Sequence, residues 1–169
     1  PRGELLGGGS AVNGSAFVRA PAADFVGWGA PWSWPNILSA YRRAESDADF
    51  GDEWHGQHGP LPIARARSLA AVSERFLHGC AVAGIESCPD INAPGASGAF
   101  RVPCTVRDGK RVDTASAYLA GTRPNLRIRH ESRVSVIDIR RGRVTGVRVG
   151  GQGFSADRVV VCAGAFESP

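Results

Sequence analysis

The chain has 169 residues, of which 43% are hydrophobic and 21% charged, and its formal net charge is +4. This length and composition suit one globular domain with a buried core, and they exclude an intrinsically disordered chain. The basic residues are scattered apart from Arg140, Arg141 and Arg143 in a predicted turn, so we expect no nucleic-acid binding. Because no apolar run approaches the roughly 18 residues of a membrane span, the sequence predicts no transmembrane segment.

The four cysteines, at positions 80, 88, 104 and 162, form no CxxC pair. This spacing favours reduced, mostly buried thiols in a cytoplasmic protein. His55 and His58 stand in a Gly-flanked turn without a third ligand at a recognisable spacing, so a role in the loop is favoured over a metal site. We therefore expect no metal ion.

The Gly-rich stretch at the start of the chain carries the strongest local signal. Gly7, Gly8 and Gly9 lack a Cβ, so their N–H groups can approach a flat ligand closely, and Ser10, Asn13 and Ser15 add short polar side chains. A flexible loop explains the composition equally well. The residues alone leave both interpretations open.

Two helices are predicted next. Residues 19–34 form an aperiodic loop rich in Pro, Gly and Trp, and Ser33 can cap a helix that begins near Pro35 and ends at the acidic run 45–49. Ser68 can cap a second helix through Ala83, with Gly84 as its C-terminal cap. The apolar stripe of that helix is formed by Leu69, Val72, Phe76, Leu77 and Cys80.

The second half of the chain is predicted to be mostly strands. Residues 86–112 are interpreted as a loop with one strand, and Asp113 or Thr114 caps a short helix through Leu119. Three strands follow at 126–130, 133–139 and 143–149, and the last two are joined by a tight turn. The continuous apolar run 158–162 predicts a strand buried on both faces of a parallel sheet.

A GxGxxG-like pattern at 151–156 is interpreted as a chance match. A dinucleotide fingerprint opens a helix after a strand, whereas this pattern precedes the predicted strand at 158–162. Neither a GxSxG elbow nor a P-loop is present, which argues against a hydrolase or an NTPase.

Six ordered motifs resemble the glucose-methanol-choline (GMC) oxidoreductases, a family of flavoenzymes. They are Pro1-Arg-Gly with Leu6-Gly-Gly-Gly-Ser and Asn13-Gly; Asp24-Phe25 through Trp32-Ser-Trp34 to Tyr41-Arg-Arg and Glu45; His55-Gly-Gln-His-Gly-Pro-Leu61; Gly109-Lys-Arg111 with Thr114-Ala-Ser-Ala-Tyr-Leu119; Arg123-Pro-Asn-Leu126; and Val159 to Pro169. The likeness covers essentially the whole chain. Its details are most similar to the mycofactocin-associated members.

This resemblance implies which residues hold the cofactor FAD. Gly8, Gly9, Asn13, Gly14 and Ser15 are expected in the loop that wraps the flavin. Val134 is expected to make a backbone contact with the adenine end, and Ala163 and Gly164 lie where a Rossmann-like sheet presents its ligands. Noncovalent FAD is expected, because members with covalent flavin use a His in this loop at a position interpreted here as Asn13.

The resemblance also implies an incomplete α/β fold of the FAD/NAD(P)-binding, Rossmann-like flavoprotein class, with part of an α+β substrate domain. Residues 1–62 are expected to be the flavin-wrapping part of the FAD-binding domain, 63–125 part of the substrate domain and its connection, and 126–169 a hairpin and strand that return to the FAD-binding domain. We interpret the chain as an interior fragment that lacks the N-terminal ADP-binding motif and the C-terminal catalytic His, so no catalytic residue is named.

The function implied for the parent protein is oxidation of the CH–OH group of a small-molecule alcohol by hydride transfer to FAD. Two alternatives stay open: a flavin-containing lyase of the same fold, and a noncatalytic flavin-binding module. The likeness to mycofactocin-associated members favours a dehydrogenase that passes electrons to a carrier. The sequence does not identify the alcohol, the electron acceptor or the oligomeric state.

Overall fold

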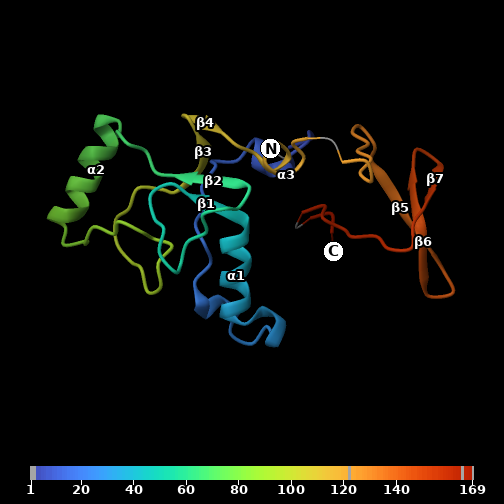
Figure 1. The fold of residues 1–169 in the computed structure, drawn as a ribbon, viewed down its shortest axis with the longest axis horizontal. Helices are drawn as coiled ribbons and strands as arrows, with labels where there is room; N and C mark the ends of the chain where they lie inside the picture. Colours follow the sequence, from blue (N-terminus) through green and yellow to red (C-terminus); the bar gives the residue numbers. More distant parts are fainter. Residues whose placement is uncertain (1–2, 122, 165, 169) are drawn as a thin grey trace. The chain divides into compact units, whose positions relative to one another are not determined.

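The computed structural model describes residues 3–121, 123–164 and 166–168. The chain divides into two compact units, Pro1–Thr122 and Arg123–Pro169, and each is described by itself (Figure 1). Parts of the first and last motifs, at residues 1, 2, 165 and 169, lie outside the described residues. The three-part domain division expected from the sequence stays a prediction.

The first helix of the first unit follows the sequence signals closely. The 3-10 helices η1 (Gly8–Ala11), η2 (Ala22–Phe25) and η3 (Ala30–Trp32) precede α1 (Trp34–Ala44). Ser33 is the residue before α1, as predicted, although its side chain makes no capping hydrogen bond. Ile37, Leu38 and Tyr41 are half-buried on one face, which confirms the predicted apolar stripe.

Helix α2 (Ala71–Val82) is preceded by Ala70 at the cap position, two residues later than the predicted cap at Ser68. Its end is confirmed, because Gly84 has φ +79° and Ile85 N–H donates to Cys80 O at 2.9 Å. The predicted stripe is only partly covered. Val72 and Phe76 are 74% and 69% exposed, so α2 keeps an apolar face that no described residue buries.

A four-stranded sheet forms the centre of the first unit. Its order is β1 (Glu45–Asp47), β2 (Leu61–Ala64), β3 (Cys104–Arg107) and β4 (Lys110–Arg111), with β1 parallel to β2 and the other pairs antiparallel. The buried side chains of Leu61 and Ile63 form its core. Two strands therefore stand where one was predicted within 86–112, because Asp108 and Gly109, with φ of +51° and +72°, close a tight hairpin.

The chain continues from this hairpin into α3 (Thr114–Tyr118), and Asp113 caps it as predicted by accepting from Ser116 N–H at 3.0 Å. The first unit also holds an aromatic cluster in the Trp-rich loop. Phe25 and Trp28 lie 5.6 Å apart, and Trp28 and Trp32 lie 5.7 Å apart, between ring centroids. Nevertheless, Trp28 and Trp32 remain 58% and 49% exposed.

The second unit is an antiparallel meander of β5 (Val134–Arg140), β6 (Arg143–Val149) and β7 (Gln152–Ser155). The predicted hairpin is confirmed: Arg141 and Gly142 have φ of +51° and +75°, which is the geometry of a two-residue turn between twisted strands. Strand β7 was not predicted. It includes most of the GxGxxG-like pattern, so that pattern opens no helix, as expected of a chance match.

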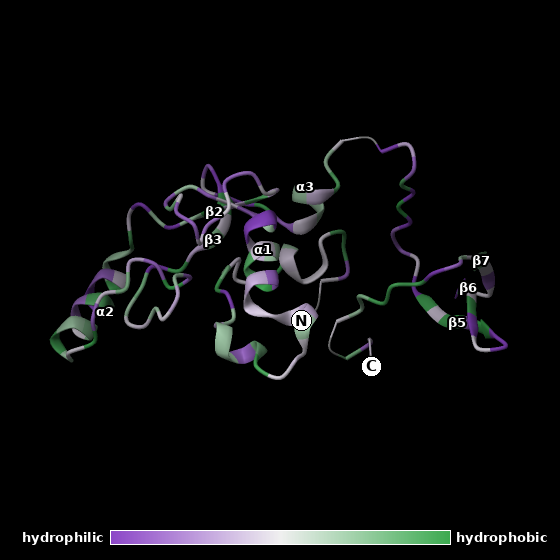
Figure 2. Cartoon of the chain, turned by 60° about the horizontal axis from the view of Figure 1, so that its bottom comes forward, coloured by the Kyte–Doolittle hydropathy of each residue, from purple (hydrophilic) through white to green (hydrophobic). Residues whose placement is uncertain are grey.

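Two predicted strands are wrong. Residues 126–130 and 158–162 form no strand, and Val160 is 84% exposed. A parallel strand buried on both faces needs hydrogen-bonded neighbours, and the described residues provide none for 158–162. Figure 2 shows hydrophobic residues along β5 and α2.

The structure also bears on the predicted absence of a transmembrane segment and on the state of the cysteines. Within the described residues, no helix combines the length and apolar character that a membrane crossing requires. All four cysteines are free thiols. The prediction that they are mostly buried is wrong, since Cys88 alone is buried and Cys162 is exposed.

Candidate functional site

The Gly-rich loop forms an ordered turn rather than a flexible segment. Gly7 and Gly8 have φ of +90° and +50°, which side chains with a Cβ rarely adopt. Ser10 N–H donates to Gly7 O at 3.1 Å, and Asn13 N–H donates to Gly9 O at 2.9 Å. At Gly3, an added Cβ would stand 2.2 Å from Gly8 O, so the backbone on either side of the turn packs in direct contact.

Asn13 and Ser15 shape the far end of the loop. Asn13 Oδ1 accepts from Ser15 N–H at 2.9 Å, a local turn that a short amide side chain can close. Ser15 is buried with φ +61°, an uncommon conformation for a residue with a Cβ. Its carbonyl accepts from Thr105 N–H at 2.8 Å, so strand β3 holds it in place. Backbone strain of this kind is concentrated at functional sites.

One side of the loop is open. A Cβ added at Gly8, Gly9 or Gly14 would meet nothing within 4 Å. In the described part of the chain, the N–H groups of Gly9 and Gly14 donate no hydrogen bond. These donors, together with bare Cα surface, fit a flat ligand with carbonyl and ring-nitrogen acceptors.

The other predicted site residues lie in the second unit. Val134 and Ala163 line the same cavity of about 440 Å³, whose walls include β5 and the apolar run 159–161. Gly164 follows with φ +82° but does not line the cavity. The structure thus brings Gly8, Gly9, Asn13, Gly14 and Ser15 together in one unit, and Val134 and Ala163 together in the other.

A buried ion network lies in the first unit, and sequence reasoning missed it. Glu45 and Asp47 on β1 are 0% and 3% exposed, and His55 on the following loop is 1% exposed. His55 Nε2 is 2.8 Å from Asp90 Oδ2, and its Nδ1 is 3.3 Å from Asp47 Oδ2 and 3.5 Å from Glu45 Oε1. The imidazole thus lies within 3.5 Å of three carboxylates, and Asp52 Oδ1, on a half-exposed side chain, lies 4.0 Å from Nε2.

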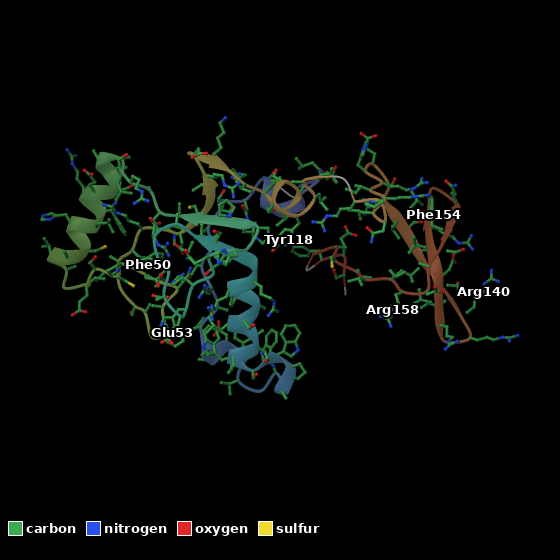
Figure 3. The ribbon with its side chains drawn as sticks, in the orientation of Figure 1. Phe50, Glu53, Tyr118, Arg140, Phe154 and Arg158 are labelled. Carbon is green, nitrogen blue, oxygen red and sulfur yellow. The ribbon has the colours of Figure 1, made fainter. Side chains whose placement is uncertain are left out.

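Two arginines complete this network. Arg65 Nη1 donates to both carboxylate oxygens of Asp47 at 2.9 Å, and its Nη2 donates to Asp90 Oδ1 at 3.1 Å. Arg19 Nη2 pairs with Glu45 Oε1. Phe50, on the loop after β1 in Figure 3, covers Arg65, with the guanidinium carbon 4.5 Å from the ring centroid.

The network shifts the pKa values of His55 and Asp47. Burial favours the neutral form of His55, but the carboxylates of Asp47 and Glu45 near Nδ1 and the hydrogen-bonded carboxylate of Asp90 outweigh it and raise the pKa of His55 to about 10. Burial would raise the pKa of Asp47, but hydrogen bonds from His55, the Asp49 backbone and Arg65 outweigh it and lower that pKa to about 2. At neutral pH, His55 is therefore an imidazolium ion and has no lone pair for a general base.

The network also anchors the segment that leaves the Gly-rich loop. Arg19 N–H donates to Asn92 Oδ1 at 2.9 Å, and Asn92 Nδ2 donates to Phe17 O at 2.9 Å. Arg19 Nη1 donates to Trp54 O at 2.8 Å. Among the described residues, no group of His, Cys, Asp or Glu is arranged to hold a metal ion.

The family follows from the match of the whole chain. A family model described as GMC oxidoreductase matches residues 1–169. The chain belongs to the GMC oxidoreductase family. It is 42% identical to a GMC-type oxidoreductase of Rhodococcus erythropolis, over 99% of this chain and 36% of the relative. It is 36% identical to an oxygen-dependent choline dehydrogenase of Sinorhizobium fredii, over 100% of this chain and 33% of the relative.

Solved structures of GMC relatives have the same fold. Pyridoxine 4-oxidase from Mesorbium loti matches with a TM-score of 0.92 and 31% identity, over 99% of this chain and 35% of that protein. Formate oxidase from Aspergillus oryzae RIB40 matches with a TM-score of 0.79 and 25% identity, over 93% and 30% respectively. The predicted α/β flavoprotein fold is thereby confirmed. The chain spans about a third of the length of these GMC relatives.

Proposed function

We propose that this chain is the part of an FAD-dependent oxidoreductase that wraps the flavin with the loop 7–15, and that the whole protein oxidises the CH–OH group of an alcohol. The observation that carries the proposal is the open side of this loop. Gly8, Gly9 and Gly14 present bare backbone there, and the N–H groups of Gly9 and Gly14 have no acceptor among the described residues. FAD is the cofactor named for the related formate oxidase.

Within this proposal, the chain's own residues bind and orient the cofactor. The loop supplies N–H donors, and the positive φ of Gly8 and the strained backbone of Ser15 set their direction. The bound FAD would accept the hydride that leaves the alcohol carbon. The base that takes the hydroxyl proton is proposed to lie outside these 169 residues, as the family resemblance implies.

We propose that FAD is held without a covalent bond. A covalent link requires a nucleophilic side chain such as His, Cys or Tyr, and residues 3–19 contain none of these. Asn13 is no substitute, because its amide is not a nucleophile and its Oδ1 already accepts two hydrogen bonds.

The second unit is proposed to bind the adenine end of FAD. Val134 and Ala163 share an apolar cavity, and Gly164 has the backbone freedom to bring its peptide close to a ligand. This assignment of the second unit depends on FAD being the cofactor, so a wild-type protein without flavin would contradict it as well.

The test uses the full-length protein with Gly8→Val and a matched control, Gly84→Val. Both glycines have a positive φ and open space around the missing Cβ, but Gly84 caps α2. We expect Gly8→Val to lose the flavin absorbance after gel filtration, because a β-branched residue cannot hold φ +50°. Gly84→Val should keep it. Full occupancy in Gly8→Val, or a wild-type protein without flavin, would contradict the proposal.

The activity is tested by dye reduction with a panel of alcohols that includes choline and pyridoxine, which the names of two relatives specify. We expect flavin-dependent dye reduction with at least one alcohol. Retained flavin without dye reduction for any alcohol would favour the lyase or the noncatalytic module. Oxygen consumption in the same assay separates an oxidase from a dehydrogenase that uses an electron carrier. We propose that the protein is a dehydrogenase that passes its electrons to a carrier.

A further inference from the structure

Arg111, at the end of β4, holds the Gly-rich loop through hydrogen bonds to its backbone and to Asn13. Its Nη1 donates to Ser10 O at 3.0 Å and to Asn13 Oδ1 at 2.8 Å, and its Nη2 donates to Asn13 O. These residues are 98 to 101 positions apart in the chain. One guanidinium thus holds three acceptors of the loop in a single fork, which only Arg can offer.

This fork decides which way the Asn13 amide points. Asn13 Oδ1 accepts from both Arg111 Nη1 and Ser15 N–H, so both of its lone pairs are used. A flipped amide would place its NH₂ group against two donors. Arg111 therefore holds Nδ2, which has no partner among the described residues, on the other side of the carboxamide, where it is a free donor.

A second set of contacts binds the start of the loop to the same region. Thr114 N–H donates to Ser10 Oγ at 2.9 Å, and Ser10 Oγ donates to Gly7 O at 2.6 Å. At Gly7, an added Cβ would stand 2.7 Å from Asp113 Oδ1. The segment 111–114 thus supports the loop from Gly7 to Asn13.

We propose that Arg111 is a positioning residue for cofactor binding. By holding the carbonyl of Asn13 toward β4, it turns the N–H group of Gly14, which belongs to the same trans peptide, away from β4, and it keeps the amide of Asn13 free for the ligand. Its bond to Ser10 O holds the preceding part of the loop. Without the fork, the loop samples other conformations, and binding must then order it at an entropic cost. The inference rests on the proposed function of the loop as the flavin site.

The experiment titrates FAD into the full-length apo-protein and measures the dissociation constant from flavin fluorescence. We expect Arg111→Ala to raise that constant by about 10-fold to 100-fold, since hydrogen bonds from a charged donor are among the stronger ones. Arg111→Lys should be intermediate, because one ammonium group cannot span the three acceptors. Lys110→Ala is the matched control: this neighbour pairs with Arg107 through its backbone, but its side chain bonds to no described residue, and the variant should bind FAD as the wild type does.

Chemical rescue separates positioning from a general loss of structure. The Arg111 side chain is exposed in this chain, so ethylguanidinium can enter the space left by Arg111→Ala. We expect ethylguanidinium to restore part of the FAD affinity and ethylammonium to restore none. Wild-type affinity in Arg111→Ala, or a loss that ethylguanidinium leaves unchanged, would overturn the inference.

Arg111→Lys keeps the proposal testable if Arg111→Ala does not fold, and wild-type affinity in Arg111→Lys would also overturn it. A wild-type protein that binds no FAD would overturn the proposed function and this inference together. Normal FAD binding by the wild type and by Arg111→Ala would overturn this inference alone.

Discussion

Replacing His55 with Gln should destabilise the protein strongly at neutral pH and hardly at all at pH 10. His55 is 1% exposed and faces Glu45, Asp47 and Asp90, with the half-exposed Asp52 at 4.0 Å, so the variant leaves four carboxylates near a neutral amide. A rise in pKa from 6.5 to about 10 corresponds to about 5 kcal/mol of stabilisation. Removing one partner from a buried ion pair costs about 3–5 kcal/mol, which agrees with the value obtained from the pKa of His55.

The sign of the pH dependence follows from the raised pKa. The contribution of His55 is fully present below pH 6.5, where the unfolded chain is also protonated. It decreases as the pH rises from 6.5 and is lost above about 10, where the folded imidazolium also loses its proton. The stability difference between wild type and His55→Gln should therefore shrink steadily across this window.

Urea unfolding of the full-length protein at pH 6.5, 8 and 9.5 measures this difference, with His58→Gln as the control. His58 lies in the same loop but is exposed, so its replacement should change the free energy of unfolding by less than about 0.5 kcal/mol. A His55→Gln effect below about 1 kcal/mol at pH 6.5, or one that does not change up to pH 9.5, would refute the buried imidazolium.

Three further predictions concern the network, the cofactor and the chain itself. Asp47→Asn should lower the free energy of unfolding by about 3 kcal/mol at pH 7. Because the pKa of Asp47 is lowered to about 2, the stabilisation that Asp47 contributes is lost as the pH falls from 3.8 toward 2. The melting curves of the wild type and Asp47→Asn should therefore converge near pH 2. Acid precipitation of the holoenzyme should release yellow flavin into the supernatant, and flavin in the washed pellet would disprove noncovalent binding. Residues 1–169 expressed alone should neither bind FAD tightly nor oxidise an alcohol, because the run at Val160 stays exposed; fluorescence titration giving a submicromolar dissociation constant would contradict this.

Local signals in the sequence were enough to predict several elements. Ser33 and Pro35 marked the start of α1, Asp113 marked the start of α3, and the Arg-Arg-Gly turn predicted the β5–β6 hairpin. Each of these depends on a few neighbouring residues whose backbone preferences agree with the fold. The start of α2 was missed because Ser68 has a side chain that favours the cap position, whereas the helix begins after Ala70, which has no capping side chain.

The long-range features could not be predicted in the same way. The acidic run 45–49 was predicted to end the first helix, which is confirmed, but nothing predicted that Glu45 and Asp47 are buried beside Arg19 and Arg65. The alternation of Glu45 and Asp47 at a period of two was a signal for a strand, but nothing local identified the distant arginines as partners. The run 158–162 has the composition of a buried strand, yet a strand also needs neighbours to bond with.

For the candidate site, the sequence predicted which loop is involved, and the structure showed which contacts hold that loop in place. The glycines at 7–9 predicted close backbone approach, and their positive φ values and open side agree with it. The role of Arg111 was not visible, because about 100 residues separate it from Asn13.

Hydrogen exchange of backbone amides tests most directly whether the loop 7–15 holds the flavin. The full-length protein would be compared with and without FAD, with peptides that cover residues 7–15 and, as a reference, α2. We predict slower exchange at residues 7–15 in the FAD-loaded protein, because bound flavin would cover the free N–H groups of Gly9 and Gly14, and no change in α2. Equal exchange of residues 7–15 in the two forms would contradict the account.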